Sequence, residues 1–208
     1  MLVSISSLRL QKKRLKMTKE KIIEIRWHGR GGQGTVTAAK IVANAAFRSG
    51  YHGVVMTPTI GTERRGVPVF TSLKISKNKI YDLSPIEKPD MIVVLDHLLL
   101  EEDGVINGLK PGGAIVINTP KPPGAYNFPG MKLAVADVTS LASQTGLKAG
   151  IVNSGIIGAF ARASGFIAIE QLTDAIKEEF KNMRPNENVK AAKLVYEKTV
   201  IGVQPGKK

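Results

Sequence analysis

The sequence predicts an α/β fold: a single domain with a mainly parallel, Rossmann-like sheet flanked by helices, with a β-hairpin and C-terminal helices added. Short runs of consecutive apolar residues, at 91–95 and 114–117, are typical of parallel strands covered on both faces. Helical patterns alternate with such strands along the chain, as parallel sheets require. With 208 residues, 43% of them hydrophobic, the chain can bury a sizeable core.

The first half of the chain alternates between β-prone runs, glycine-rich breaks and an alanine-rich segment that favours helix. Its expected elements are a strand at 21–27, a helix at 35–49, a strand from 54 to 56, a loop at 57–68, and a hairpin of 69–75 and 80–83 around a turn at 77–79.

The second half contains the buried strands and most of the helices. Asp96 lies at the carboxyl end of the strand at 91–95, and Asp137 is placed to cap a helix that closes at Gly146. The remaining expected elements are a helix at 98–109, a strand at 114–117, a loop at 121–130, a strand at 132–136, and helices at 153–163, 169–180 and 189–199.

Charge and composition exclude several classes of protein. The chain has 30 basic and 17 acidic residues, a formal net charge of +13, which favours an anionic partner. It has no cysteine, which excludes disulfides, zinc–thiolate sites and thiolate-held iron–sulfur clusters. No apolar run approaches the ~20 residues that span a bilayer. We expect a cytoplasmic protein with a basic N-terminal arm at 1–20, a domain at 21–202 and a tail at 203–208.

A glycine loop between the first strand and the first helix is the main candidate for binding. It has the pattern G-x-G-x-x-G, which exposes main-chain N–H groups and lets a phosphate approach the helix N-terminus. Arg30 adds a planar cation, and Thr35 offers a hydroxyl. The candidate residues of this loop are Gly29, Arg30, Gly31, Gly32, Gln33, Gly34 and Thr35.

Two alternatives to phosphate binding remain open for this loop. The glycines could serve close helix–strand packing alone. The loop could also bind a nicotinamide dinucleotide in a freestanding oxidoreductase, but that site needs an acid about twenty residues further on to bind the ribose. The corresponding segment, Val54-Val55-Met56-Thr57-Pro58, contains no acid.

A second candidate lies in the loop after the second strand. Glu63, Arg64 and Arg65 stand between two glycines, and adjacent arginines can clamp a phosphate or pair with a partner chain. Loops at the carboxyl ends of parallel strands converge on one crevice, so we expect this loop beside the glycine loop. The three histidines have no spacing that suggests a metal site, and no catalytic set stands out.

These two motifs resemble the gamma subunit of 2-oxoacid:ferredoxin oxidoreductases. The segment 26–34 with Thr37-Ala38-Ala39-Lys40 is similar to its opening, and 61–69 to the second signature of its pyruvate branch. Further similarity lies at 89–96 and in the helix from Asn153, so the resemblance covers about 21–202. The resemblance implies pyruvate as the oxoacid, with branched-chain, oxalate or aryl relatives left open because Thr62 replaces a common alanine.

The resemblance also implies cofactors and partners. In this family a 2-oxoacid is decarboxylated on thiamine diphosphate, with Mg, between alpha and beta subunits. Iron–sulfur clusters on the beta and delta subunits carry electrons to ferredoxin, and coenzyme A accepts the acyl group. The gamma subunit helps to form the coenzyme A site, which places Gly29 to Thr35 near the coenzyme and Arg64 and Arg65 as phosphate or interface cations, with Glu63 orienting them. It implies no catalytic residue, nucleic acid or membrane for this chain.

Overall fold

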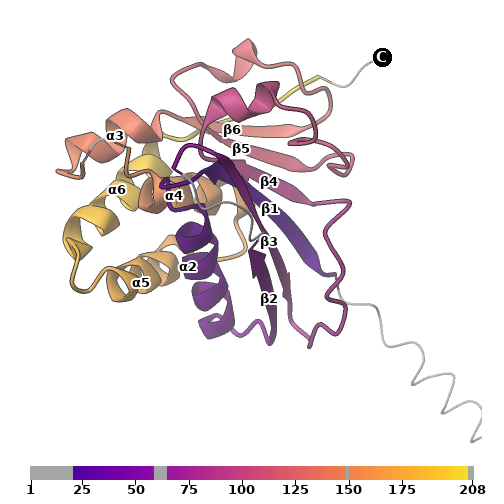
Figure 1. Cartoon of the computed structure of the whole chain (residues 1–208), viewed down its shortest axis with the longest axis horizontal. Coiled ribbons are helices and arrows are strands. Elements are labelled where there is room, and N and C mark those ends of the chain that lie inside the picture. Colours follow the sequence, from indigo (N-terminus) through magenta and orange to yellow (C-terminus); the bar gives the residue numbers. More distant parts are fainter. Residues whose placement is uncertain (1–20, 59–64, 149, 206–208) are drawn as a thin grey trace, which may run out of the picture.

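A seven-stranded sheet runs through the molecule, and the α-helices gather on one of its faces (Figure 1). The computed structural model describes residues 21–58, 65–148 and 150–205. In chain order the elements are β1 (Ile23–Arg30), α2 (Thr35–Arg48), β2 (Gly53–Pro58), β3 (Pro68–Ser76), β4 (Met91–Val94), the 3-10 helix η1 (His97–Glu101), β5 (Ala114–Asn118), the 3-10 helix η2 (Pro123–Ala125), β6 (Lys132–Ala136), α3 (Val138–Gln144), α4 (Asn153–Ser164), α5 (Ile169–Glu179), α6 (Pro185–Lys198) and β7 (Val200–Val203).

The strand order is β2-β3-β1-β4-β5-β6-β7. β1, β4, β5 and β6 pair in parallel, whereas β3 is antiparallel to both its neighbours and β7 is antiparallel to β6. β2 therefore points the same way as β1, and the sheet is mainly parallel, as predicted. None of the helices within the described residues is long and apolar enough to cross a bilayer.

The expected hairpin around residues 77–79 is wrong, although an antiparallel pair is present. β3 pairs with β2 on one side and with β1 on the other. Both edges of β3 are thus occupied by strands, and residues 80–83 have no edge to join. They run as irregular chain instead.

The helix expected at 98–109 is also wrong beyond its first turn. Only η1 forms, and Gly104 and Gly108 then take left-handed backbone conformations, with φ of 93° and 75°. A side chain at Gly108 would put its Cβ 2.0 Å from the Glu87 carbonyl oxygen, so this glycine is needed for close passage of the chain. At the other end of the chain, β7 is a strand that the sequence pattern did not predict.

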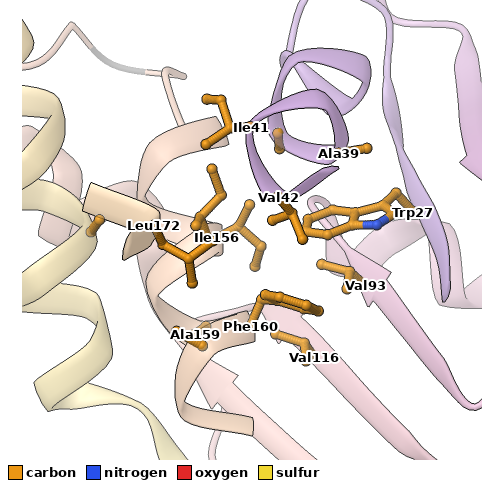
Figure 2. Packing of buried hydrophobic residues seen from close by; sticks show 14 of the residues in the cluster. Trp27, Ala39, Ile41, Val42, Val93, Val116, Ile156, Ala159, Phe160 and Leu172 are labelled. Carbon is orange, nitrogen blue, oxygen red and sulfur yellow. The ribbon is translucent and has the colours of Figure 1, made fainter. Parts of the chain in front are cut away.

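The main core lies between the sheet and the helices. Trp27 of β1 and Phe160 of α4 are fully buried, with ring centroids 5.3 Å apart, and Val42 and Ile156 pack around them (Figure 2). Gly158 lets α4 pack closely on α6, since a Cβ there would lie 2.0 Å from the Ala192 carbonyl oxygen. The backbones of α4 and α6 therefore lie in close contact at this point.

The opposite face of the sheet is covered unevenly. A second apolar cluster, which includes Ile92, Ile115 and Leu133, lies over β4, β5 and β6 beneath irregular chain. On β1 the same face carries Arg26 and His28, which line a cavity rather than an apolar core. This polar stretch leads directly to the glycine loop at the end of β1.

Candidate functional site

The glycine loop begins inside β1, because Gly29 and Arg30 are the last residues of that strand. A Cβ at Gly29 would lie 2.1 Å from the hydroxyl oxygen of Thr35, the first residue of α2. Gly32 and Gly34 have φ of 93° and 78°, in the left-handed region that favours glycine. The loop therefore needs glycine for a tight turn, and Gly29 for the close return of α2.

The loop after β2 meets the glycine loop through two main-chain hydrogen bonds. The Gly31 amide donates to the Val67 carbonyl at 2.8 Å, and the Gly66 amide donates to the Gly31 carbonyl at 3.0 Å. The aliphatic part of Arg65 lies over Gly32, with Cγ 3.6 Å from where a Cβ of Gly32 would stand. The expected meeting of the two loops is confirmed for 65–67. Glu63 and Arg64 lie outside the described residues.

Arg30 is held by carboxylates of its own chain. Its Nε donates to Asp96 Oδ2 at 2.8 Å, and a terminal nitrogen lies 3.5 Å from Glu102 Oε1. Asp96 follows β4, the parallel neighbour of β1, so the pair links the carboxyl ends of two strands. Arg30 fixes the loop to the sheet, and its charge is already compensated.

Gln33 shapes the loop from within. Its side-chain oxygen accepts the Arg30 amide at 2.7 Å, and its own amide donates to the Arg30 carbonyl at 3.0 Å. The amides of Gly32 and Gly34 have no hydrogen-bond acceptor among the described residues. These two donors adjoin the first-turn amides of α2, which also have no acceptor in the described part of the chain, because the N-cap, Gly34, provides no side-chain bond.

Thr35 is placed differently from the expectation that its hydroxyl is available to a ligand. The residue is 3% exposed, and its hydroxyl oxygen points at Gly29 without a hydrogen-bond partner in the described chain. On the other side of the loop, Gly34 lies against Asn153, since a Cβ there would be 2.6 Å from Asn153 Nδ2. The N-termini of α2 and α4 therefore meet at the loop.

Two cavities flank the glycine loop. One, of 350 Å³, lies over the start of α2 and is lined by Arg30, Gly31, Gly32, Gly34, Thr35, Val36 and Val69. The other, of 530 Å³, lies at the carboxyl ends of β4, β5 and β6, and Asp96, Asn118 and Asp137 face it. The sequence motifs did not predict this second cavity. The polar residue that follows each buried strand was the signal that could have found it.

The histidines do not form a shared site. Burial, and then the positive charge of Arg26, lowers the pKa of His28 to about 4, so its imidazole is neutral at pH 7. His97 borders the larger cavity. Among the described residues no three His, Cys, Asp or Glu side chains are grouped to hold a metal ion.

The strand order removes the basis of the dinucleotide alternative. In a Rossmann dinucleotide site, the acid that binds the ribose ends the strand next to the first one. Here β3 lies between β1 and β2, which places the end of β2 two strands away, about 10 Å. β2 also ends in Thr57 and Pro58, without an acid.

The fold and the glycine loop identify a general class of protein. It is an α/β protein with a glycine loop at the carboxyl edge of a mainly parallel sheet, and its described residues include no group of metal ligands. A model of one family, pyruvate ferredoxin/flavodoxin oxidoreductase, matches residues 24–198. The chain belongs to this family. It is the gamma-type subunit of a 2-oxoacid:ferredoxin oxidoreductase, an enzyme of several subunits.

The similarity to known relatives extends over nearly the whole length of each relative. The pyruvate/ketoisovalerate oxidoreductases common subunit gamma of Thermococcus kodakarensis is 43% identical over 185 residues, 86% of this chain and 98% of the relative. The pyruvate synthase subunit PorC of Methanothermobacter marburgensis is 40% identical over 85% of this chain and 97% of its own. The crystal structure of the pyruvate oxidoreductase subunit PORC of Thermotoga maritima has a TM-score of 0.76 and 32% identity, covering 88% and 99%.

Proposed function

We propose that this subunit binds the phosphate groups of coenzyme A at the meeting point of its two loops, and that the chain is inactive without its partner subunits. The observation that supports this best is the hydrogen-bonded contact between the loops. It brings Arg65 over Gly32, whose amide, like that of Gly34 two residues later, has no acceptor among the described residues. Amides without acceptors and a cation are what a phosphate requires.

The residues of the loop take different parts in this proposal. Gly32 and Gly34 donate from the main chain, and Arg65, an exposed residue, contributes charge. Arg30 and Gln33 hold the loop in shape through Asp96 and through the Arg30 amide, respectively. Thr35 supports the turn beneath Gly29. Glu63 and Arg64 are proposed to extend the site from the same loop, with Arg64 as a second cation.

The chemistry of the reaction falls to other subunits in this proposal. The chain has no cysteine to ligate an iron–sulfur cluster. We assign thiamine diphosphate, Mg and the clusters to alpha, beta and delta subunits, and we infer ferredoxin as the indirect electron acceptor. Coenzyme A would then reach an active site that lies between chains, with its nucleotide end on this subunit. Pyruvate is the oxoacid that the sequence signatures favour.

The test is kinetic and uses the assembled enzyme. We expect Arg65→Ala to raise the KM for coenzyme A about 10- to 100-fold, because one charge-assisted contact contributes about 1.5–3 kcal/mol. The KM for the oxoacid should stay unchanged. Arg48→Ala, at the far end of α2, is the matched control.

An unchanged KM for coenzyme A in an intact Arg65→Ala complex would show that Arg65 does not contact the coenzyme. A second variant, Asp96→Asn, tests the role given to Arg30. Because it weakens the bond that holds the loop to β4, we expect it to raise the KM for coenzyme A while leaving Arg65 in place. A rise in both Michaelis constants would point to general damage instead.

A further inference from the structure

A continuous groove crosses the helix-free face of the sheet at β2, β3 and β1. It consists of two cavities, of 170 Å³ and 410 Å³, which share Phe70, Ser72 and Pro85 in their linings. The smaller cavity is largely apolar and includes Val55 and Leu83. None of these lining residues belongs to the glycine loop.

The apolar end of the groove is exposed to a degree unusual for such side chains. Leu83 is 70% exposed and Phe70 is 43% exposed, although both line the groove. Tyr81, two residues before Leu83, is 84% exposed. Contiguous apolar surface of this kind is typical of a protein–protein contact. Burial of one such leucine would strengthen a complex about tenfold or more.

The other end of the groove contains polar groups that lack partners. The Arg26 guanidinium donates to the Val105 and Asn107 carbonyls at 3.0 and 2.6 Å, but its Nε has no acceptor, and no described carboxylate lies within 4 Å of it. His28 Nε2 is likewise buried, with no hydrogen-bond partner in the part of the chain that the structure describes.

No carboxylate of the described residues forms an ion pair with Arg26, including Asp103, which lines the same cavity. Burial lowers the pKa of Arg26, as expected for a cation that has lost water without gaining an anion. Glu102 and Asp103 border the same cavity, but Glu102 lies 3.5 Å from Arg30 and is paired there. A carboxylate that approached Arg26 from outside would supply the missing charge and the missing acceptor.

We propose that this groove is the docking site of another subunit of the same oxidoreductase. The occupant is an extended segment that places an apolar side chain between Phe70 and Leu83 and a carboxylate at Arg26. A second copy of this chain fits less well, because the formal net charge of +13 would oppose +13. The inference rests on membership of a multisubunit enzyme and is independent of the coenzyme site.

The experiment co-expresses the tagged chain with the other subunits of its own complex and measures their co-purification. We expect Leu83→Asp to weaken assembly about tenfold or more, because it removes the apolar contact. Leu83→Lys should weaken it to a similar extent, since it removes the same contact. Phe47→Asp, on α2 and 64% exposed, is the matched control on the opposite face and should assemble normally. Arg26→Gln should lose affinity as well.

Each other outcome counts against the proposal. Normal assembly of Leu83→Asp would overturn it, as would an equal loss in Phe47→Asp. Undiminished assembly in Arg26→Gln would show that the occupant places no carboxylate at Arg26. Intact assembly with a raised KM for coenzyme A would assign the groove to the coenzyme. Thermal unfolding of each isolated chain by circular dichroism checks folding, and the exposed position of Leu83 predicts no change.

Discussion

β5 and β1 are separated in the sheet by β4 alone, but their two faces are covered differently. β5 is buried at all five positions, because helices cover one face and the irregular chain around η1 and η2 covers the other. β1 buries Trp27 and Ile25 against the helices, but its alternate residues, Arg26 and His28, face a cavity. The covered strand is apolar at its first four positions, 114–117, whereas β1 alternates.

The sheet therefore has one half that is covered on both faces and one half that is covered on a single face. The strands that are covered on both faces form the apolar framework. Asp96, which follows one of them, β4, fixes Arg30 in place. The half that is covered on one face has charged and aromatic side chains along a cavity, and Phe70 there is 43% exposed. Four measurements test this difference between the two halves of the sheet.

The largest effect should come from removing a ring on the helix side. We expect Phe160→Ala to lower the free energy of unfolding by about 3–5 kcal/mol, because Phe160 is fully buried and packs on Trp27 and Phe166. Phe70→Ala on the other face should cost less than about 1 kcal/mol, since Phe70 is 43% exposed. Chemical denaturation of both variants measures this. Similar losses would contradict the distinction between the faces.

The next effect concerns backbone packing in the helix layer. Gly158→Ala should cost about 2–3 kcal/mol, because the added methyl group would lie 2.0 Å from the Ala192 carbonyl oxygen and push α4 from α6. Gly124→Ala in η2 is the control and should change stability by less than about 0.5 kcal/mol, since nothing lies within 4 Å of its Cβ position. Thermal midpoints that move equally would show that the helices do not pack at this point.

A pH effect tests the polar face of β1. In the unfolded chain the pKa of His28 has the ordinary histidine value of 6.5, but burial and the charge of Arg26 lower this pKa to about 4 in the folded chain. Between pH 4 and pH 6.5 the unfolded state binds more protons than the folded state. The contribution of His28 to the free energy of unfolding is therefore full above pH 6.5 and is lost as the pH falls toward 4. At pH 4.5 the loss should be about 2 kcal/mol.

His28→Gln should remove this part of the pH dependence. The comparison is the free energy of unfolding at pH 7 and pH 4.5 in both proteins. Asp82 does not interfere, because hydrogen bonds to Ser84 and Lys74 lower its pKa to about 2, and its contribution is lost only in more acidic solution. An identical fall in His28→Gln would show that another group titrates.

The smallest effect should come from an exposed ion pair between α2 and α5. Arg48 contacts Glu178, but both side chains are more than half exposed to solvent. Water and salt screen such pairs, so Arg48→Ala should change the free energy of unfolding by less than about 1 kcal/mol. A loss above about 2 kcal/mol by chemical denaturation would show that charge, as well as packing, holds the helix layer.

The sequence predicted most of the elements, for reasons that are local. The apolar runs of β4, β5 and β6, the alanine-rich α2 and the Asp137 cap of α3 are read from neighbouring residues, and Asp137 accepts the Ser140 amide as expected. The two signatures indicated the family, and that prediction is confirmed. The binding residues of the glycine loop remain a prediction.

The errors arose where distant parts of the chain compete. Residues 80–83 are β-prone, but β3 already had strands on both edges, and no local pattern reports that. β7 forms because β6 offers an open edge to the segment after α6. The cavity beside Asp96 and Asn118 depends on which strands are neighbours, which the sequence does not state.

By itself the sequence determined the class of the fold, the family and the two loops that meet, because periodicity, glycine placement and signature motifs act over a few residues. The three-dimensional fold was needed to show that Asp96 neutralises Arg30, that Thr35 is enclosed, and that no carboxylate of the described residues pairs with Arg26. The physical reason is that charge compensation and burial depend on residues brought together from far apart. Arg30 and Asp96 are 66 positions apart in the chain and 2.8 Å apart in the fold.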